Sequence, residues 1–495
     1  MSDSQQPYTI VIGLETHVQL QTATKLFCGC STQFGAPANT QTCPVCTGHP
    51  GTLPVMNRRA FELALQTAAA LNCNIATYTK WDRKQYYYPD LPKGYQISQY
   101  DLPFSYEGWL EISDAKGKFD PKRVRIIRAH LEEDAGKSMH DEHAGKADSK
   151  IDLNRTGTPL LEIVTHPDMR SPAEAKAYLT ELKLLLTYLG VSDCNMQEGS
   201  LRVDANVNLH IDTPQGKVAT PIVEIKNMNS FRAVERAIAY EAERQYAEWQ
   251  ETGKKLGDPG VFKQTRGWDD GAGVTRGQRA KEESSDYRYF PDPDLVPVTV
   301  SEERIKDVHR SLGELPAAIR LRLESTYGLT PYDSDVIVNQ GRTFVDYYAE
   351  VAAAAGDGKA SSNWLQQDVL RVMGERNLTI EQYPVQAPAL GDLIKRVKAG
   401  EVDTGRGREV LQRMFDTGES AELAMKTLGI EQVDESALVA LCEELVAANP
   451  KIVADVKAGK MQAAGSFVGQ AKKKNPNANP ARVKDLCLAI IAKLP

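Results

Sequence analysis

Acidic side chains recur inside apolar, strand-like stretches in the first half of the chain. Glu162 lies within the run L-L-E-I-V at residues 160–164, and Glu132 ends a similar run that begins near residue 122. Burying a carboxylate among aliphatic side chains is unfavourable unless it is paired or binds a cation. Each carboxylate alone is compatible with a solvated strand face, because strand carboxylates are mostly exposed. Their recurrence on several strands is what indicates a cation-binding site.

The alternation of side chains along a strand predicts that these acidic side chains lie on the same face of a sheet. Successive side chains of a strand point to opposite faces, so Glu15 and His17 share one face near residues 10–20, as a surface ion pair or as part of a site. If the strands share one sheet, the side chains that can converge are Glu15, His17, Glu132, Glu162, Asp204 and Glu224. Oxygen-rich ligation favours Mg²⁺ or Mn²⁺. A divalent metal on a carboxylate face suits phosphoryl transfer from ATP.

Four of the eight cysteines form two closely spaced pairs. Cys28 and Cys30 are followed, after twelve intervening residues, by Cys43 and Cys46, and the segment between them is rich in Thr, Gln, Pro and Gly. Two such pairs on turn-rich backbone can close a tetrahedral, structural Zn²⁺ site, and the alternative is four reduced thiols. The other cysteines are scattered, which favours a reducing cytoplasm over a disulfide framework.

A basic, tyrosine-rich stretch at residues 81–100 has no simple period and is typical of an ordered loop. Arginine, lysine and stacking tyrosine suit a nucleotide or phosphate, and the alternative is a tyrosine-packed structural loop. The predicted nucleotide or nucleic-acid contacts in the first half of the chain are Arg83, Lys84, Tyr88, Lys93, Arg202 and Lys226. The tripeptide G-K-S at 136–138 is not a phosphate-binding P-loop, because Leu131 stands where the first glycine is required.

Charge is distributed unevenly. The formal net charge is −7, but the last 45 residues carry +7, which leaves −14 on the rest of the chain. The basic tail includes Lys472, Lys473 and Lys474 and predicts a polyanionic partner. The first residues lack the basic and apolar regions of a signal peptide, and no apolar run reaches the length of a membrane span, so neither secretion nor a membrane location is expected.

The elements that must position these residues can be predicted from periodicity. Strands are predicted near residues 10–20, 122–132, 160–164, 201–210 and 221–226, and helices over 57–71, from Ser171 to Gly190, and over 231–252. The proline-rich end of the segment 286–295 suggests a boundary, after which the pattern is mostly helical. Three domains are therefore predicted, at residues 1–295, 296–404 and 405–495.

Several long motifs resemble the B subunit family of the bacterial aspartyl/glutamyl-tRNA amidotransferases, over essentially the whole chain. They include V-I-G-L-E-T-H-V-Q-L, H-L-E-E-D-A-G-K-S, D-L-N-R-T-G-T-P-L-L-E-I-V, V-E-I-K-N-M-N-S-F, D-Y-R-Y-F-P-D-P-D-L and G-S-F-V-G-Q. The resemblance implies an α+β fold: a mostly antiparallel β cradle with flanking helices and a zinc-knuckle insertion, then an all-helical domain and a small helical tail domain that binds tRNA.

The resemblance also implies an activity. Such a protein uses Mg-ATP to phosphorylate the side-chain carboxylate of mischarged Asp-tRNA(Asn) or Glu-tRNA(Gln), and ammonia then forms the amide. Its implied partners are an amidase A subunit and a small C subunit in a heterotrimer, with a non-discriminating aminoacyl-tRNA synthetase as a further candidate and no DNA. The sequence contains no G-x-S-x-G elbow of its own for releasing ammonia. A non-catalytic tRNA-binding scaffold is the alternative.

By position, the family's metal-binding and catalytic residues correspond to His17, Glu132 and Glu162. Glu15, Asp204 and Glu224 form a second set of metal ligands, and the zinc ligands correspond to the four paired cysteines. The chain departs from the family pattern at Gln85 and Tyr87, where Asn and Phe are expected, at residues 263–265, and in a longer loop at 141–150.

Overall fold

The computed structural model describes residues 7–140, 149–278, 287–430 and 434–494. Most of the long 141–150 loop and the first residue of the D-Y-R-Y-F motif lie outside these ranges. The chain divides into two compact units, Met1–Pro316 and Ala317–Pro495. The finer boundaries at 295/296 and 404/405 stay predictions.

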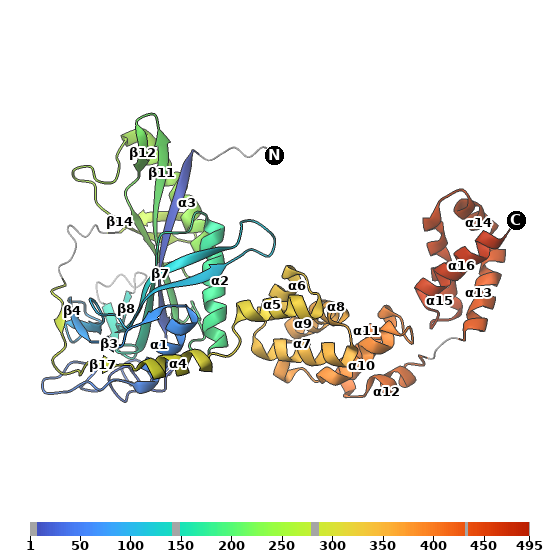
Figure 1. Ribbon diagram of the computed structural model, residues 1–495, viewed down its shortest axis with the longest axis horizontal. Coiled ribbons are helices and arrows are strands. Elements are labelled where there is room, and N and C mark those ends of the chain that lie inside the picture. The colour runs from blue at the N-terminus through green and yellow to red at the C-terminus, as the bar shows by residue number, and fades with distance from the viewer. Residues whose placement is uncertain (1–6, 141–148, 279–286, 431–433, 495) are drawn as a thin grey trace. The chain divides into compact units, whose positions relative to one another are not determined.

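The first unit is built on a ten-stranded sheet (Figure 1). Its strand order is β15-β14-β13-β11-β1-β10-β7-β6-β2, with β12 paired to β11. All neighbours are antiparallel except β13 and β14, which are parallel. The strands are β1 (Tyr8–Gln19), β2 (Asn74–Ile75), β6 (Ser105–Ile112), β7 (Lys122–Glu133), β10 (Pro159–Thr165), β11 (Leu201–Thr213), β12 (Gly216–Ala219), β13 (Val223–Lys226), β14 (Gln264–Asp269) and β15 (Val274–Gly277).

Alternation gives the sheet two chemically different faces. One face carries aliphatic side chains such as Ile12, Leu161 and Val203, all buried in one hydrophobic core. Helices α2 (Pro172–Tyr188) and α3 (Phe231–Thr252) pack against each other and cover this face. The opposite face carries the polar members of the same strands. The five predicted strands and the antiparallel α+β architecture are thus confirmed.

The helices of this unit begin where the sequence provides caps. Ser171 and Ser230 accept hydrogen bonds from backbone N–H groups in the first turns of α2 and α3, and Asn57 does so for α1 (Arg58–Ala70). Proline at the first position of α2 costs nothing, because that N–H has no partner within the helix. All three predicted helices are present, and a fourth, α4 (Glu302–Ser311), packs on α1.

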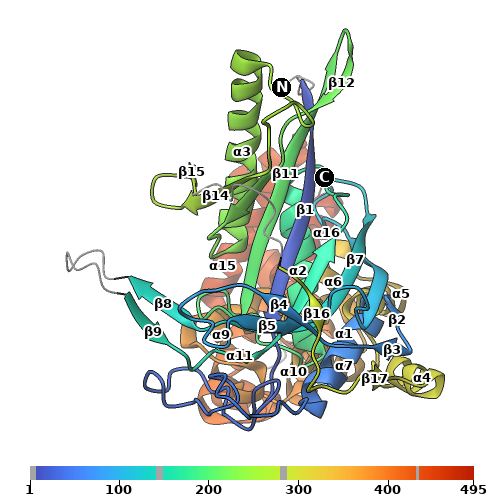
Figure 2. The same cartoon turned by 90° about the vertical axis from the view of Figure 1, so that its left-hand side faces the viewer.

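Short strands cover part of the polar face. A three-stranded sheet of β16 (Phe290–Pro291), β4 (Asp82–Gln85) and β5 (Tyr95–Ser98) lies on the side of the large sheet away from α2 and α3 (Figures 1 and 2). Two further strand pairs are β3 (Tyr78–Thr79) with β17 (Val298–Thr299) and β8 (Lys137–His140) with β9 (Ser149–Asp152). The basic, tyrosine-rich stretch is therefore a strand pair with its connecting turn.

The second unit is helical throughout its described part. Its helices are α5 (Pro316–Tyr327), α6 (Pro331–Val338), α7 (Arg342–Ala355), α8 (Gly358–Trp364), α9 (Leu370–Arg376), α10 (Ala387–Lys398), α11 (Thr404–Thr417), α12 (Ala421–Thr427), α13 (Glu435–Ala448), α14 (Pro450–Lys457), α15 (Gly465–Lys474) and α16 (Pro480–Lys493). The last four helices share a small core that includes Leu438, Phe467 and Ile491. Within the described residues of either unit, none of the helices has the length and apolar character of a membrane span.

Candidate functional site

The strand register brings the predicted acids together on the polar face. His17 of β1 lies opposite Glu162 of β10, and Glu162 lies opposite His130 of β7. Glu132 is two residues further along β7 and therefore points to the same face. The central residues of the prediction thus come from three adjacent strands, far apart in sequence.

The side chains of His17, Glu132 and Glu162 form one cluster. His17 Nε2 is 3.9 Å from Glu132 Oε1 and 3.8 Å from Glu162 Oε2. Each residue offers a ligand atom, and the three atoms lie within 4.8 Å of one another. Two carboxylate oxygens and an imidazole nitrogen at this separation can bind one divalent cation.

Electrostatics support a cation at this position. Burial, and after it the charge of Glu162, raises the pKa of Glu132, which is only 3% exposed. Burial also opposes ionisation of Glu162, but His130 and His17 lower the pKa of Glu162 overall. Two adjacent buried carboxylates ionise together only at a cost, which a metal ion would remove.

The second set of predicted ligands surrounds a lysine. Lys226 Nζ lies 2.5 Å from Asp204 Oδ2 and 3.4 Å from Glu224 Oε1. Glu15 accepts a hydrogen bond of 2.8 Å from Asn206 Nδ2. The ammonium group of Lys226 already offsets much of the negative charge of Asp204 and Glu224, so the chain provides a cation here itself.

Both groups of acids face one cavity of about 830 Å³. Its floor is the polar face of the sheet, and its wall carries Lys84, Tyr86, Tyr88 and Tyr287. Lys84 Nζ lies 4.8 Å from the centre of the Tyr287 ring. A cavity with carboxylates at one side and an ammonium group and aromatic rings at the other can take a phosphate group and a planar base.

Other predicted contact residues are engaged within the protein. Arg83 pairs with Asp292 at 2.7 Å and stacks on the ring of Tyr95. Lys93 forms a buried ion pair with Glu133. Ligand binding by Arg83 and Lys93 stays a prediction, and the contacts observed for them hold the three-stranded sheet and the end of β7 in place.

Arg202 is bound to an aspartate that the sequence analysis did not single out. Arg202 Nη2 donates to Asp134 Oδ1 at 2.9 Å, and Gln19 Nε2 donates to Asp134 Oδ2 at 2.7 Å. Arg155 Nε lies 3.6 Å from the same carboxylate. Burial raises the pKa of Asp134, but Arg202 and Arg155 lower it overall.

His130 is a second residue missing from the prediction. Its Nε2 lies 3.3 Å from Glu162 Oε2 and 3.8 Å from Glu132 Oε2. The alternation that places Glu132 on the polar face also places His130 there, because the two are separated by one residue. That signal was present in the motif H-L-E.

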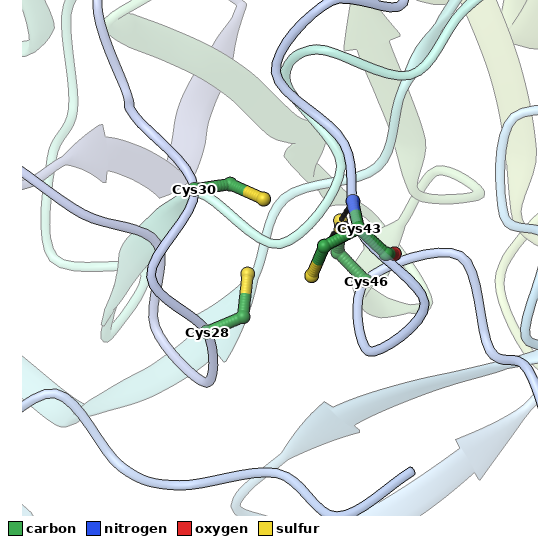
Figure 3. A group of neighbouring side chains, drawn as sticks. All are labelled: Cys28, Cys30, Cys43 and Cys46. Carbon is green, nitrogen blue, oxygen red and sulfur yellow. Dashed lines mark hydrogen bonds between the residues drawn. The ribbon is translucent and has the colours of Figure 1, made fainter.

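The four paired cysteines form a second cluster (Figure 3). Their sulfur atoms lie within 4.8 Å of one another and point toward a common space. Cys43 Sγ and Cys46 Sγ are 3.9 Å apart. Tetrahedral zinc with Zn–S bonds of about 2.3 Å requires a sulfur–sulfur separation of about 3.8 Å, so this cluster fits a metal ion such as zinc.

The tail lysines differ in their surroundings. Lys472 pairs with Asp403 at 2.6 Å, and Lys474 lies 2.5 Å from Glu444. Lys473 is exposed on the last turn of α15. Lys473 is therefore the member of the trio best placed to contact a polyanion.

Comparison with known proteins identifies the class to which this fold and site belong. Residues 10–306 match the model of the GatB/GatE catalytic domain, and residues 346–491 match that of the GatB domain. A relative from Rhodopirellula baltica, named as the B subunit of an aspartyl/glutamyl-tRNA(Asn/Gln) amidotransferase, is 60% identical over 99% of this chain and 98% of its own. Relatives of the same name from Moorella thermoacetica and Carboxydothermus hydrogenoformans are 48% and 44% identical, over 97% and 98% of this chain and 98% and 99% of their own. The chain belongs to the GatB family of amidotransferase B subunits.

Proposed function

We propose that this protein catalyses ATP-dependent amidation of Asp-tRNA(Asn), Glu-tRNA(Gln) or both. Its relatives are named as B subunits of aspartyl/glutamyl-tRNA(Asn/Gln) amidotransferases, which supports the tRNA-dependent part of the proposal. The observation that carries the catalytic part of the proposal is the cluster of His17, Glu132 and Glu162 at one side of a large polar cavity.

The chemistry requires activation of a carboxylate. A free carboxylate is a poor acyl donor, because its leaving group would be oxide. In the proposed first step, an oxygen of the tRNA-linked carboxylate attacks the γ-phosphorus of ATP, the bond to the bridging oxygen breaks, and ADP leaves. In the second step, ammonia attacks the carbonyl carbon, the C–O bond to phosphate breaks, and a proton from nitrogen goes to the departing phosphate.

The residues of the cavity have separate roles in this proposal. Glu132, Glu162 and His17 would hold Mg²⁺, which would neutralise phosphate charge and help to position the carboxylate. Lys84 provides a positive charge for a phosphate group, and Tyr88 offers an aromatic surface. Lys226, held between Asp204 and Glu224, keeps the neighbouring acids compensated.

Partners complete the reaction. Ammonia is proposed to come from an amidase A subunit, with a small C subunit completing a heterotrimer, and charged tRNA is the substrate. The cytoplasm is the expected location, because translation supplies charged tRNA there. A non-discriminating aminoacyl-tRNA synthetase is proposed as a further partner, because such an enzyme would supply the mischarged tRNA.

The proposal is tested by forming the amide from ammonium. The complete complex is supplied with Mg-ATP, an ammonium salt and either Asp-tRNA(Asn) or Glu-tRNA(Gln), so that product does not depend on glutamine hydrolysis. ATP-dependent Asn-tRNA or Gln-tRNA is expected. ATP-dependent product that is fully retained when Glu132 of this chain is replaced by glutamine would instead support a scaffold whose partner does the chemistry.

Zinc is the metal proposed for the cysteine cluster, from its four thiol ligands and their spacing. One zinc per chain is expected by elemental analysis of protein purified without added metal. Cys43→Ser is expected to lose it, because three sulfur ligands remain, whereas Cys73→Ser in the hydrophobic core is expected to keep it. Freshly purified protein without zinc would restore the interpretation as four reduced thiols.

The basic tail is proposed to contact the tRNA backbone. Lys473→Gln is expected to reduce the slope of log K against log salt concentration by about 0.9 for one lost phosphate contact, and by somewhat less if the contacted strand is unpaired. Filter binding or anisotropy at several salt concentrations measures this slope. Lys116→Gln, an exposed lysine in the first unit, is the charge-matched control. An unchanged slope in Lys473→Gln would show that this lysine does not touch the backbone.

A further inference from the structure

Lys25 is the residue whose surroundings the proposed reaction does not explain. It follows β1, and its side chain is completely buried, with 0% exposure. Its Nζ donates to the carbonyl oxygen of Gln41 at 2.7 Å and to that of Leu153 at 3.4 Å. The same nitrogen lies 3.6 Å from Cys46 Sγ. One ammonium group therefore joins the cysteine segment to the turn that precedes β10.

A buried ammonium group is unfavourable without an anionic partner. Within the described part of the chain, Lys25 has no ion pair with a carboxylate, and its polar contacts are two carbonyl groups and Cys46. The anionic partner in contact with Lys25 is the cysteine cluster, because Cys46 Sγ lies beside its Nζ, whereas the nearby carboxylate of Glu133 is already paired with Lys93. Four thiolates around one Zn²⁺ carry a net charge of −2, so a metal-loaded cluster provides that charge.

Gly157 brings Lys25 and Cys46 close to Glu133, at the end of strand β7, which also carries Glu132. Gly157 has a φ of +84°, and a Cβ added there would lie 3.5 Å from Glu133 Oε1, 3.6 Å from Cys46 Cβ and 3.6 Å from Lys25 Cδ. The three side chains thus meet at Gly157. Its N–H donates to the carbonyl oxygen of Asp134 at 2.8 Å.

Glu133 links this group of side chains to the residues around the cavity. Its carboxylate binds Lys93 and accepts a hydrogen bond of 3.1 Å from the N–H of Ile97 in β5. Glu132 is its neighbour on β7 and points to the opposite face, into the acidic cluster. A shift of the cysteine segment would act on the end of β7 and hence on Glu132.

We propose that Lys25 is a positioning residue whose ammonium group is the buried counter-ion of the metal-loaded cysteine cluster and fixes that cluster to the end of the catalytic strand. This inference rests on the zinc proposed above and goes beyond it. It assigns a function to a lysine outside both clusters and couples metal occupancy to the geometry at Glu132.

The test compares Lys25→Met with wild type and with Lys116→Met, an exposed control, each in the complete complex. Zinc content is measured first, and zinc transfer to a chromophoric chelator is then followed with time. Loss of the counter-ion is expected to speed release about 10-fold or more. Amide formation from ammonium is expected to fall in the same variant, while Lys116→Met behaves as wild type in both measurements.

A spectroscopic readout separates this role from general packing. With Co²⁺ in place of zinc, removing a positive charge beside Cys46 is expected to shift the sulfur-to-metal charge-transfer band to longer wavelength. Lys25→Gln, which lacks the charge but keeps a polar group, serves if Lys25→Met does not fold, and the same shift is expected.

The outcomes distinguish the two proposals. Full zinc content with unchanged release and an unshifted band in the Lys25 variants would overturn the role of Lys25 and leave the zinc site standing. Wild-type protein without zinc, and unable to bind Co²⁺ through sulfur, would overturn both. Faster release with a shifted band, absent from Lys116→Met, supports the proposal.

Discussion

Glu132→Gln is expected to reduce amide formation from ammonium by about 10³-fold, on the scale of losing a buried group that stabilises transition-state charge. Glu132 is 3% exposed and shares the cluster with His17 and Glu162. Glutamine has nearly the same shape but no negative charge, so the proposed metal site loses an anionic ligand and binds the cation more weakly, without a cavity being created. The effect is expected mainly in kcat, measured from the initial rates of Asn-tRNA or Gln-tRNA formation.

Binding of tRNA provides the internal control for this variant. The dissociation constant for charged tRNA is expected to change by less than about 2-fold, because phosphate contacts dominate nucleic-acid affinity and Glu132 is buried below the cavity. Glu111→Gln on β6 makes the same charge change at an exposed ion pair with Arg123 and is expected to retain activity. Full activity in Glu132→Gln would remove Glu132 from the catalytic assignment.

The positions of the acids were predictable because strand alternation is simple. A residue on a strand has two possible directions, so the pattern around Glu162 and Asp204 indicates which residues share a face once their neighbours are recognised as core. The strands carrying these residues were also found at nearly the predicted positions, Pro159–Thr165 and Leu201–Thr213. His130 could have been found by the same reasoning.

What alternation does not determine is where a long side chain ends. Lys226 was predicted as a nucleotide or tRNA contact on the same strand face as Glu224, and its ammonium group also lies beside Asp204 of the neighbouring strand β11. Arg83 pairs with Asp292, a residue more than 200 positions away, because β4 and β16 are neighbours in the small sheet. Such partners depend on tertiary strand pairing, for which the sequence has no local signal.

The burial of Lys25 was unpredictable for a related reason. The stretch T-A-T-K-L has no apolar period and is typical of a solvated loop. Two segments that are distant in sequence, around Gln41 and Leu153, close over the lysine only in the folded chain. Cysteine spacing can indicate a metal site, but it does not reveal the charge that compensates it.

Asp134→Asn is expected to destabilise the first unit by about 2–3 kcal/mol at neutral pH, somewhat less than the loss of one partner from a fully buried ion pair. Asp134 is 2% exposed and accepts hydrogen bonds from Arg202 and Gln19. In asparagine, an NH₂ group replaces one of the two accepting oxygens. That NH₂ group would face the N–H donor of Arg202 or of Gln19, so one of the two hydrogen bonds would be lost. The expected loss of stability is smaller than for a fully buried ion pair, because solvent screens the two arginine side chains, which are 35% (Arg202) and 31% (Arg155) exposed.

Urea unfolding followed by tryptophan fluorescence measures this loss. The signal reports mainly on the first unit, which holds four of the five tryptophans, Trp81, Trp109, Trp249 and Trp268. Asp212→Asn, at an exposed pair with Lys217, is the matched control and is expected to unfold as wild type does. Equal midpoints for Asp134→Asn and wild type would show that the buried pair contributes no net stability.

The pH dependence of the unfolding free energy shows whether the charge of Asp134 stabilises or destabilises the folded state. Burial opposes ionisation of Asp134, but Arg202 and Arg155 hold its pKa below the ordinary value. A carboxylate with a lowered pKa in the folded state stabilises fully above its unfolded pKa of about 3.9, and this contribution is lost as pH falls through the folded value. The difference between wild type and Asp134→Asn is therefore expected to persist from pH 7 to about pH 4 and to shrink in stronger acid. A difference that grew on acidification would contradict a stabilising charge at Asp134, because protonation makes the two side chains electrostatically alike.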